Sequence, residues 1–370
     1  MSYVGIARLA LSDTGSSTAA AVSLTDAEIL AKIEVGPIEL NLKGGYCPWG
    51  LCHDWSGNIY MSDSTTHVIL KIEEGGRVST VAGEKTTPGN NGTLQNVPAT
   101  SARFRNPRGI CCDKSGTLYV ADAGNHQIRT IRGGLVNVLA GSGLANGGSG
   151  FVDGQAIQIG GVGTQAKFNT PVDVAVDKSG TVYVSDNGNN AIRKIKANTV
   201  TTIAGNGNPG DRENLVPTAG NGATYPAHNA CLTAPREVTC DPSGNVYIVD
   251  YNNDKIKKIA KNGALYLFSG SGATGRSLGA QDVVAGTSKS NTCSYTDIWD
   301  IDNDESGNVY VLDQKATDNN TQGSRLIKID MEGTPSVVAE FGGGTYNMAV
   351  YSVMCSPGQK LFVGFYVAQS

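Results

Sequence analysis

A pattern of apolar and polar positions, ten residues long, recurs five times along the chain. In each copy an apolar stretch ends at an Asp, a Ser-Gly pair follows, and alternating Val, Ile and Tyr residues lead to a second Asp. Gly permits the positive φ of a tight turn, and the Asp carboxylate can accept hydrogen bonds from turn N–H groups. Each copy therefore predicts a β-hairpin. The residues assigned to this structural repeat are Asp54, Asp113, Asp177, Asp241, Asp304, Gly57, Gly116, Gly180, Gly244, Gly307, Tyr60, Tyr119, Tyr183, Tyr247 and Tyr310.

A longer repeat surrounds each hairpin. A strand that usually opens with Pro precedes it, and two further alternating strands follow, the second usually ending in Ala-Gly. The complete copies occupy residues 47–83, 104–141, 168–205, 232–270 and 295–342, with an insertion at 314–324 in the last. Residues 348–355 and 360–367 match only the front half of a copy, and residues 29–33 and 38–42 match only the back half.

These repeats predict an all-β fold, a six-bladed β-propeller of four-stranded antiparallel blades. The sixth blade is closed by strands from both chain ends, because joining the two half-copies leaves no exposed strand edges. Residues 28–370 form the propeller in this interpretation, and residues 1–27, rich in Ser, Thr and Ala, form an N-terminal arm or linker. The inter-blade loops at 84–103, 142–167, 206–231 and 271–294 are expected on one face.

Composition and charge narrow the range of functions. With 48 Gly and only 17% charged residues the chain suits short strands and turns, and its net charge of −4 gives no basic footprint for nucleic acid. The chain has no apolar run of 18 residues, so no membrane span is expected. The N-terminus lacks a basic start, and its apolar stretch is bounded by Arg8 and Asp13. A signal peptide is therefore not expected, and cytoplasmic synthesis is expected. The eight cysteines, without a C-x-x-C motif, are interpreted as buried free thiols.

The segments 106–129 and 168–193 resemble NHL repeats, and the resemblance extends over residues 28–370. It implies a β-propeller. The NHL family includes binding platforms, extracellular sensor domains, lyases and relatives of lactonases, so the resemblance implies no single activity.

Candidate chemistry lies four residues before each turn Asp, where the first strand of a blade would face the central channel. The copies read Gly50, Gly109, Asp173, Glu237, Asp300 and Ser352. Together with Asp302, the acids Asp173, Glu237 and Asp300 could converge at a channel mouth and hold Ca²⁺, the one cofactor the sequence suggests. Related lactonase-type propellers use a metal there. The alternative is that these carboxylates are solvated or paired with Arg, and Arg108 and Arg236 are further candidates for binding.

Three functions are compatible with these residues. The first is a non-enzymatic structural or interaction propeller that docks onto a larger protein assembly through residues 1–27 and the inter-blade loops. Its hypothesised setting is a phage virion, as a head or tail decoration. This reading is favoured because none of the six channel positions carries the His that a zinc lyase would need. The alternatives are a calcium-dependent lactonase-like or lyase-like enzyme and a ligand-binding sensor module.

Overall fold

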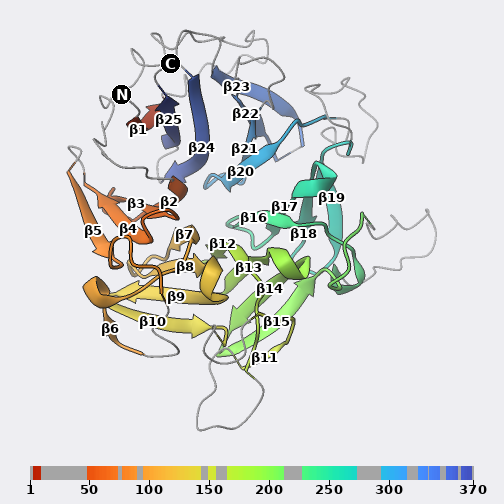
Figure 1. The fold of residues 1–370 in the computed structure, drawn as a ribbon. Coiled ribbons are helices and arrows are strands. Elements are labelled where there is room, and N and C mark those ends of the chain that lie inside the picture. The colour runs from red at the N-terminus through yellow and green to blue at the C-terminus, as the bar shows by residue number, and fades with distance from the viewer. Residues whose placement is uncertain are drawn as a thin grey trace. The chain divides into compact units, whose positions relative to one another are not determined.

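A computed structural model describes residues 3–9, 48–73, 77–89, 95–142, 149–155, 165–211, 227–272, 293–314, 324–331, 333–341, 347–356 and 360–368. Within these ranges the chain is all-β, with short 3-10 turns and no α-helix (Figure 1). The predicted secondary-structure class is thus confirmed.

Consecutive antiparallel strands form each of the first four sheets. The first sheet consists of β2 (Pro48–His53), β3 (Ile59–Asp63), β4 (Val68–Ile72) and β5 (Val78–Ala82). The second consists of β7 (Pro107–Cys112), β8 (Leu118–Asp122), β9 (Gln127–Arg132) and β10 (Leu135–Ala140), and the third of β12 (Pro171–Val176), β13 (Val182–Asp186), β14 (Ala191–Lys196) and β15 (Thr199–Ala204). The fourth consists of β16 (Pro235–Cys240), β17 (Val246–Asp250), β18 (Lys255–Ile259) and β19 (Leu265–Ser269).

A fifth sheet repeats the arrangement with β20 (Ile298–Asn303), β21 (Val309–Gln314), β22 (Ser324–Ile329) and β23 (Pro335–Phe341). Two-residue strands, β6 (Val97–Pro98) and β11 (Gly154–Gln155), extend the second and third sheets beyond β10 and β15. Five blades with the predicted four-stranded antiparallel order are therefore present.

The blade count differs from the prediction of six, because the remaining sheet has three strands in the order β1-β25-β24. β24 (Asn347–Ser356) and β25 (Lys360–Ala368) are the predicted front half, and their partner β1 (Tyr3–Leu9) comes from the segment expected to be an arm. The strands predicted at 29–33 and 38–42 lie outside the described residues, as do residues 315–323 of the insertion predicted at 314–324.

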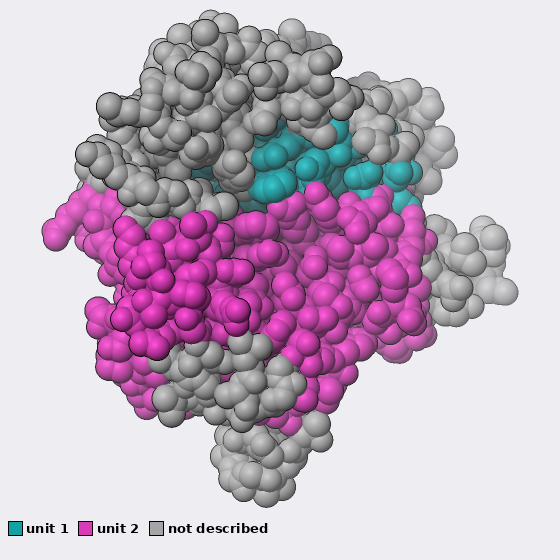
Figure 2. Space-filling model, in the orientation of Figure 1, with its two compact units in different colours: residues 1–44, 254–256, 268–370 teal, residues 45–253, 257–267 magenta. Residues whose placement is uncertain are grey.

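The chain divides into two compact units, coloured in Figure 2. Unit 1 comprises residues 1–44, 254–256 and 268–370, and unit 2 comprises residues 45–253 and 257–267. In unit 2 the first strands of successive blades lie side by side, β2 against β7, β7 against β12 and β12 against β16. This row of inner strands positions the site described below.

Turn chemistry explains why the repeated Asp and Gly form hairpins. The Asp113 carboxylate accepts hydrogen bonds from the backbone N–H groups of Ser115 (2.8 Å) and Thr117 (2.9 Å) and from the hydroxyl of Tyr119 (3.0 Å). Gly116 adopts a φ of 78°, a conformation that other residues avoid. Burial alone would raise the pKa of Asp113, but the hydrogen bonds from Ser115, Thr117 and Tyr119 hold it below its usual 3.8. These contacts are consistent with a structural role for the repeated residues, which stays a prediction.

Replacing Asp113 by Ala tests this role. The turn loses several hydrogen bonds to a charged acceptor, and we expect the free energy of unfolding to fall by about 2 kcal/mol. Because the folded-state pKa of Asp113 is lowered, its stabilisation is present above pH 3.8 and disappears as the pH falls through the folded pKa. Urea denaturation at pH 7 and at a pH below the folded pKa of Asp113 measures both effects. An equal loss at both pH values would contradict this assignment.

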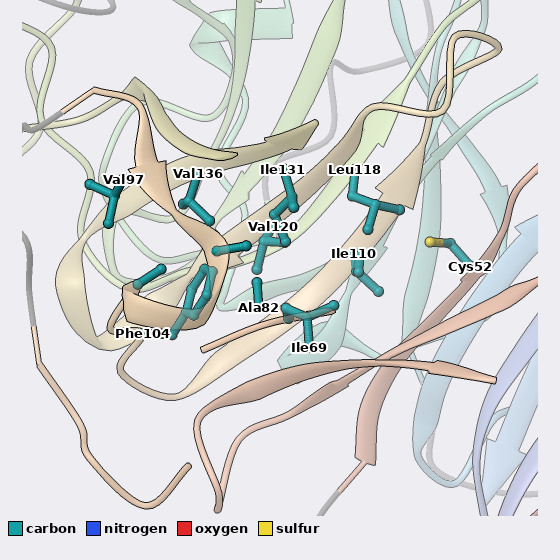
Figure 3. Packing of buried hydrophobic residues seen from close by; sticks show 12 residues of the cluster. Cys52, Ile69, Ala82, Val97, Phe104, Ile110, Leu118, Val120, Ile131 and Val136 are labelled. Atoms are coloured by element: carbon teal, nitrogen blue, oxygen red, sulfur yellow. The ribbon is translucent and has the colours of Figure 1, made fainter. Parts of the chain in front are cut away.

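The core of unit 2 lies between neighbouring blades. Figure 3 shows Ile69 and Ala82 of the first blade beside Val120 of the second, with Phe104 from the segment that precedes β7. All four side chains are fully buried. Apolar residues at alternate strand positions thus stack blade against blade, which is the packing expected of sheets in a propeller.

A buried cation lies beside the second Asp of most blades. Arg193 Nη1 is 2.7 Å from Asp186, Lys257 Nζ is 2.7 Å from Asp250, and Arg325 Nε is 2.7 Å from Asp313. Arg129 forms a longer contact of 3.4 Å with Asp122. In the first blade Leu70 stands at the place of the cation. Arg129, Arg193 and Lys257 each follow an Ile near the start of the third strand, whereas Arg325 follows Ser324 and pairs directly with Asp313. In each case the positive charge offsets an otherwise isolated buried carboxylate.

Candidate functional site

The inner strands of unit 2 share an irregularity near their first residues. Each of β2, β7, β12 and β16 opens with Pro, and the register of its pairing with the next strand shifts just after that Pro. Such bulges redirect side chains and are common beside active sites. The residues in the irregular stretch are Trp49 and Gly50, Arg108 and Gly109, Val172, and Arg236 and Glu237, and Asp173 directly follows the irregular stretch of β12.

The residue before the Pro of β7, β12 and β16 has left-handed backbone geometry, with φ of 48° at Asn106, 52° at Thr170 and 50° at Ala234. These conformations are costly for Thr and Ala, and contacts from the preceding blade hold them. The N–H of Thr170 donates to Nδ1 of His126 (3.0 Å), and the N–H of Ala234 donates to Oδ1 of Asn190 (2.9 Å). The strained residue before the Pro, held by a contact from the preceding blade, therefore fixes where the inner strand begins.

Asp173 joins neighbouring inner strands. Its Oδ2 accepts a hydrogen bond from the N–H of Val238 on β16 at 2.8 Å. On the other side, a Cβ added to Gly109 of β7 would overlap Asp173 Oδ1. Gly at this position thus makes room for the carboxylate of the next blade, and Asp173 is placed against β7 and β16 at once.

Glu237 is buried next to Asp173, with 7% of its surface exposed. Burial raises the pKa of Glu237 well above 4.5, and the negative charge of Asp173 raises it further, against the opposing charge of Arg236. The two carboxyl groups share a hydrogen bond. A hydrogen bond between two carboxyl groups uses a proton on one of them, and the raised pKa of Glu237 favours Glu237 as the protonated member.

Cations and aromatic rings complete this cluster. The guanidinium of Arg108 lies 4.3 Å from the centre of the Trp49 ring, and that of Arg236 lies 5.1 Å from the same ring and 4.8 Å from the ring of Tyr251. Trp49, Arg108 and Tyr251 are half-buried, whereas the acids are buried. We call these six residues the inner-strand cluster: Trp49, Arg108, Asp173, Arg236, Glu237 and Tyr251.

The other two acids predicted for a metal belong to unit 1. Asp300 Oδ2 accepts from the Ser352 hydroxyl (2.6 Å) and the N–H of Val353 (2.8 Å), and Asp302 Oδ2 accepts from the N–H of Cys355 (2.7 Å). Like Asp173, they bind the next inner strand. Among the described residues no three His, Cys, Asp or Glu side chains gather as metal ligands. Ca²⁺ takes six to eight oxygen ligands, so it would need the carboxylates of several acids to converge. A calcium site formed by all four acids stays a prediction.

Sequence reasoning found the acids and both arginines of the cluster but missed Trp49 and Tyr251. The signal for Trp49 was present, because it follows the strand-opening Pro exactly as Arg108 and Arg236 do. Tyr251 follows the second Asp of its blade, where the other copies have a small or polar residue. Its ring reaches Arg236 only through the pairing of β16 with β17.

The fold is a β-propeller, and its repeats match a known family. The NHL repeat family matches residues 104–131 and 168–195. The chain therefore contains NHL repeats at these two places, as the resemblance of segments 106–129 and 168–193 predicted.

Relatives among known proteins are similar over parts of their length. Protein SUPPRESSOR OF QUENCHING 1, chloroplastic, of Arabidopsis thaliana is 26% identical over 226 residues, 58% of this chain and 19% of that protein. NHL repeat-containing protein 2 of Gallus gallus is 32% identical over 146 residues, 37% of this chain and 18% of that protein. The chain thus spans a fifth or less of the length of these relatives.

A gluconolactonase from Xanthomonas campestris has a similar structure, with a TM-score of 0.51 and 11% identity over 98% of this chain and 97% of that chain. At this identity the likeness concerns the fold. In the described part of the chain, no helix has the length and apolar character needed to span a membrane.

Proposed function

We propose that this NHL propeller is an acid–base enzyme of the lactonase or lyase kind, with its site at the inner-strand cluster. The observation that carries the proposal is the carboxyl pair of Asp173 and buried Glu237, in which burial and the charge of Asp173 raise the pKa of Glu237 well above 4.5 against the opposing charges of Arg236 and Arg108. Paired titratable groups with strongly shifted pKa values are typical of acid–base sites. The similar fold of a gluconolactonase agrees with this class of reaction.

In the hydrolysis of a lactone, each residue of the inner-strand cluster has its own role. Arg108 and Arg236 hold the carbonyl oxygen of the substrate and stabilise the negative charge that develops on it. Asp173, as the carboxylate, takes a proton from the attacking water, whose oxygen bonds to the carbonyl carbon. The ring C–O bond then breaks, and Glu237 gives its proton to the leaving oxygen. The rings of Trp49 and Tyr251 supply apolar surface for the substrate.

Replacement of Glu237 by Gln tests the proposal, because Gln keeps the shape but cannot donate the proton. With a panel of aldonolactones that includes D-glucono-1,5-lactone, we expect kcat to fall about 10²-fold while KM changes little. Glu305→Gln, an exposed acid in a hairpin turn, is the matched control and retains wild-type rates. Wild-type turnover by Glu237→Gln, or no turnover of any lactone by the wild type, contradicts the proposal.

The same variant has a second readout in folding stability. A raised folded-state pKa means that folded Glu237 binds a proton that the unfolded chain releases above pH 4.5, so stability falls as the pH rises from that value toward the folded pKa. In Glu237→Gln this dependence is absent. The stability difference between variant and wild type therefore changes with pH, which separates a protonated Glu237 from an ordinary ionised carboxylate.

Docking onto a larger assembly is the second candidate function. Trp55, in the turn between β2 and β3, is 53% exposed and lies 5.0 Å from the Lys114 ammonium, which gives unit 2 an exposed aromatic contact for a protein partner. Sedimentation with a large particle in fixed copy number, weakened by Trp55→Ser, would support it. The phage virion setting, cytoplasmic synthesis and the roles of residues 1–27 and the inter-blade loops stay predictions.

A further inference from the structure

A cavity in unit 2 lies at the other end of the inner strands from the cluster. It has a volume of about 730 Å³ and is lined by the hairpin turns of the third and fourth blades, by β14 and β15, and by Ala227 and His228. Asp173 of the cluster and Asp177 of the cavity lie at the two ends of β12, about 13 Å apart for the rise of a β-strand. The cavity, which we call the inter-blade groove, is thus separate from the proposed active site.

Lysines dominate the charge of the inter-blade groove. Lys178 comes from the β12–β13 turn, Lys194 and Lys196 from β14, and Lys261 from the β18–β19 turn. Lys194 and Lys196 are two residues apart on one strand, so they share a face. Within the described ranges none of these four ammonium groups forms an ion pair, although the chain carries a net charge of −4.

The two carboxylates of the groove offset only part of the charge of the four lysines, and turn donors already hold their oxygen atoms in place. Asp177 accepts from the N–H groups of Ser179 (2.8 Å) and Thr181 (2.9 Å) and from the Tyr183 hydroxyl (3.3 Å). Asp241 likewise accepts from its own turn and from Tyr247 (3.1 Å). Four cations therefore face two acids whose oxygen atoms are already hydrogen-bonded.

The groove walls also suit a ligand of moderate size. Its volume falls within the range of small-molecule sites, about 300–1,000 Å³. Ile203, Val246 and Ile259 supply apolar surface, and exposed Ser243 and Asn262 supply neutral polar groups at the rim. A ligand with a single charge would engage one or two of the lysines, whereas one with several anionic groups could engage lysines from both blades.

We propose that the inter-blade groove binds a small anion that carries two or more phosphate or carboxylate groups, bridging the third and fourth blades. Lysine is a compact point charge that suits such groups without demanding one fixed geometry. Because Lys178 and Lys261 come from different blades, a bound anion would offset the repulsion between like charges on both sides of the groove.

Isothermal titration calorimetry at low salt, with pyrophosphate and with citrate as probes, tests the proposal. We expect one or both to bind, about tenfold more weakly in Lys178→Glu/Lys261→Glu. Binding is expected to persist in Lys178→Arg/Lys261→Arg. A preference for pyrophosphate identifies a phosphate ligand, and a preference for citrate identifies a carboxylate ligand.

Lys114→Glu is the matched control, since Lys114 occupies the same turn position in the second blade but does not line the groove. Failure of both probes to bind would overturn the proposal. An equal loss of binding in Lys114→Glu would do the same, because it would indicate a diffuse effect of charge. Tighter binding of a single-stranded RNA octamer through the same lysines would also overturn it, in favour of a nucleic-acid surface.

Discussion

Arg193→Leu is expected to lower the free energy of unfolding by about 3–5 kcal/mol, the cost of leaving a buried charge without its partner. Arg193 is fully buried and contacts both Asp186 and Asp153 at 2.7 Å. It also donates to the carbonyl oxygens of Lys167 and Val152. Leu offers none of these donors, so Asp186 keeps only its bonds from neighbouring amides. Denaturation in guanidinium chloride measures the loss.

The effect of Arg193→Leu should depend on pH. Burial raises the pKa of Asp186 to about 6 although Arg193 opposes the shift, so stability falls as the pH rises from 3.8 to about 6. Without Arg193 the pKa rises further and the fall continues above pH 6. The deficit of the variant is therefore larger at pH 8 than at pH 5.

Arg132→Leu, at an exposed strand end, is the control for Arg193→Leu and should change stability by less than about 0.5 kcal/mol. A deficit below about 1 kcal/mol for Arg193→Leu would show that the buried pair adds little to stability.

Gly109→Ala is expected to destabilise the protein by about 3 kcal/mol, because the added methyl group overpacks the space between two inner strands. The new Cβ would overlap the Asp173 carboxylate and lie 2.5 Å from the Asp173 Cα. Asp173 must then move, which breaks its bond to Val238 and separates it from Glu237. Thermal unfolding measures the stability, and lactone hydrolysis measures the effect on the proposed site.

Gly50→Ala is the matched comparison on the neighbouring strand. Its Cβ would meet backbone atoms of Arg108 and Gly109 at 3.1 Å, a contact that small shifts can relieve. We therefore expect a smaller loss of stability, and hydrolysis that changes less. If the two variants behave alike, the close approach of Gly109 to Asp173 is not what positions the carboxyl pair.

Local chemistry made the blades predictable from the sequence. The Asp and Gly of each hairpin act through atoms a few residues away, as in the bonds that Asp113 accepts, so the motif alone carries the information. The Pro that opens β7, β12 and β16 likewise marks the first residue of an inner strand. The two-residue strands β6 and β11 were not predictable, because so short a stretch has no periodicity and pairs only after the blade beside it has formed.

The candidate site was partly predictable for the same reason. Its acids share one repeat position, so Asp173 and Glu237 could be expected on neighbouring strands. Their contact and the raised pKa of Glu237 depend on burial and on how closely two blades approach, which no single repeat encodes. The inter-blade groove is a further case, since its lysines come from turns and strands that are unremarkable by themselves.

Pairing of β1 with β25 has a consequence for the order of folding. Tyr3 lies opposite Val367, and Leu9 opposite Leu361, so this ladder joins residues from the two extremes of the chain. During synthesis from the N-terminus, the sheets made of consecutive hairpins can form as soon as their own strands emerge. β1 must wait for almost the entire chain. Loop closure over so long a separation is entropically costly and slow, so this sheet is expected to be the last to form.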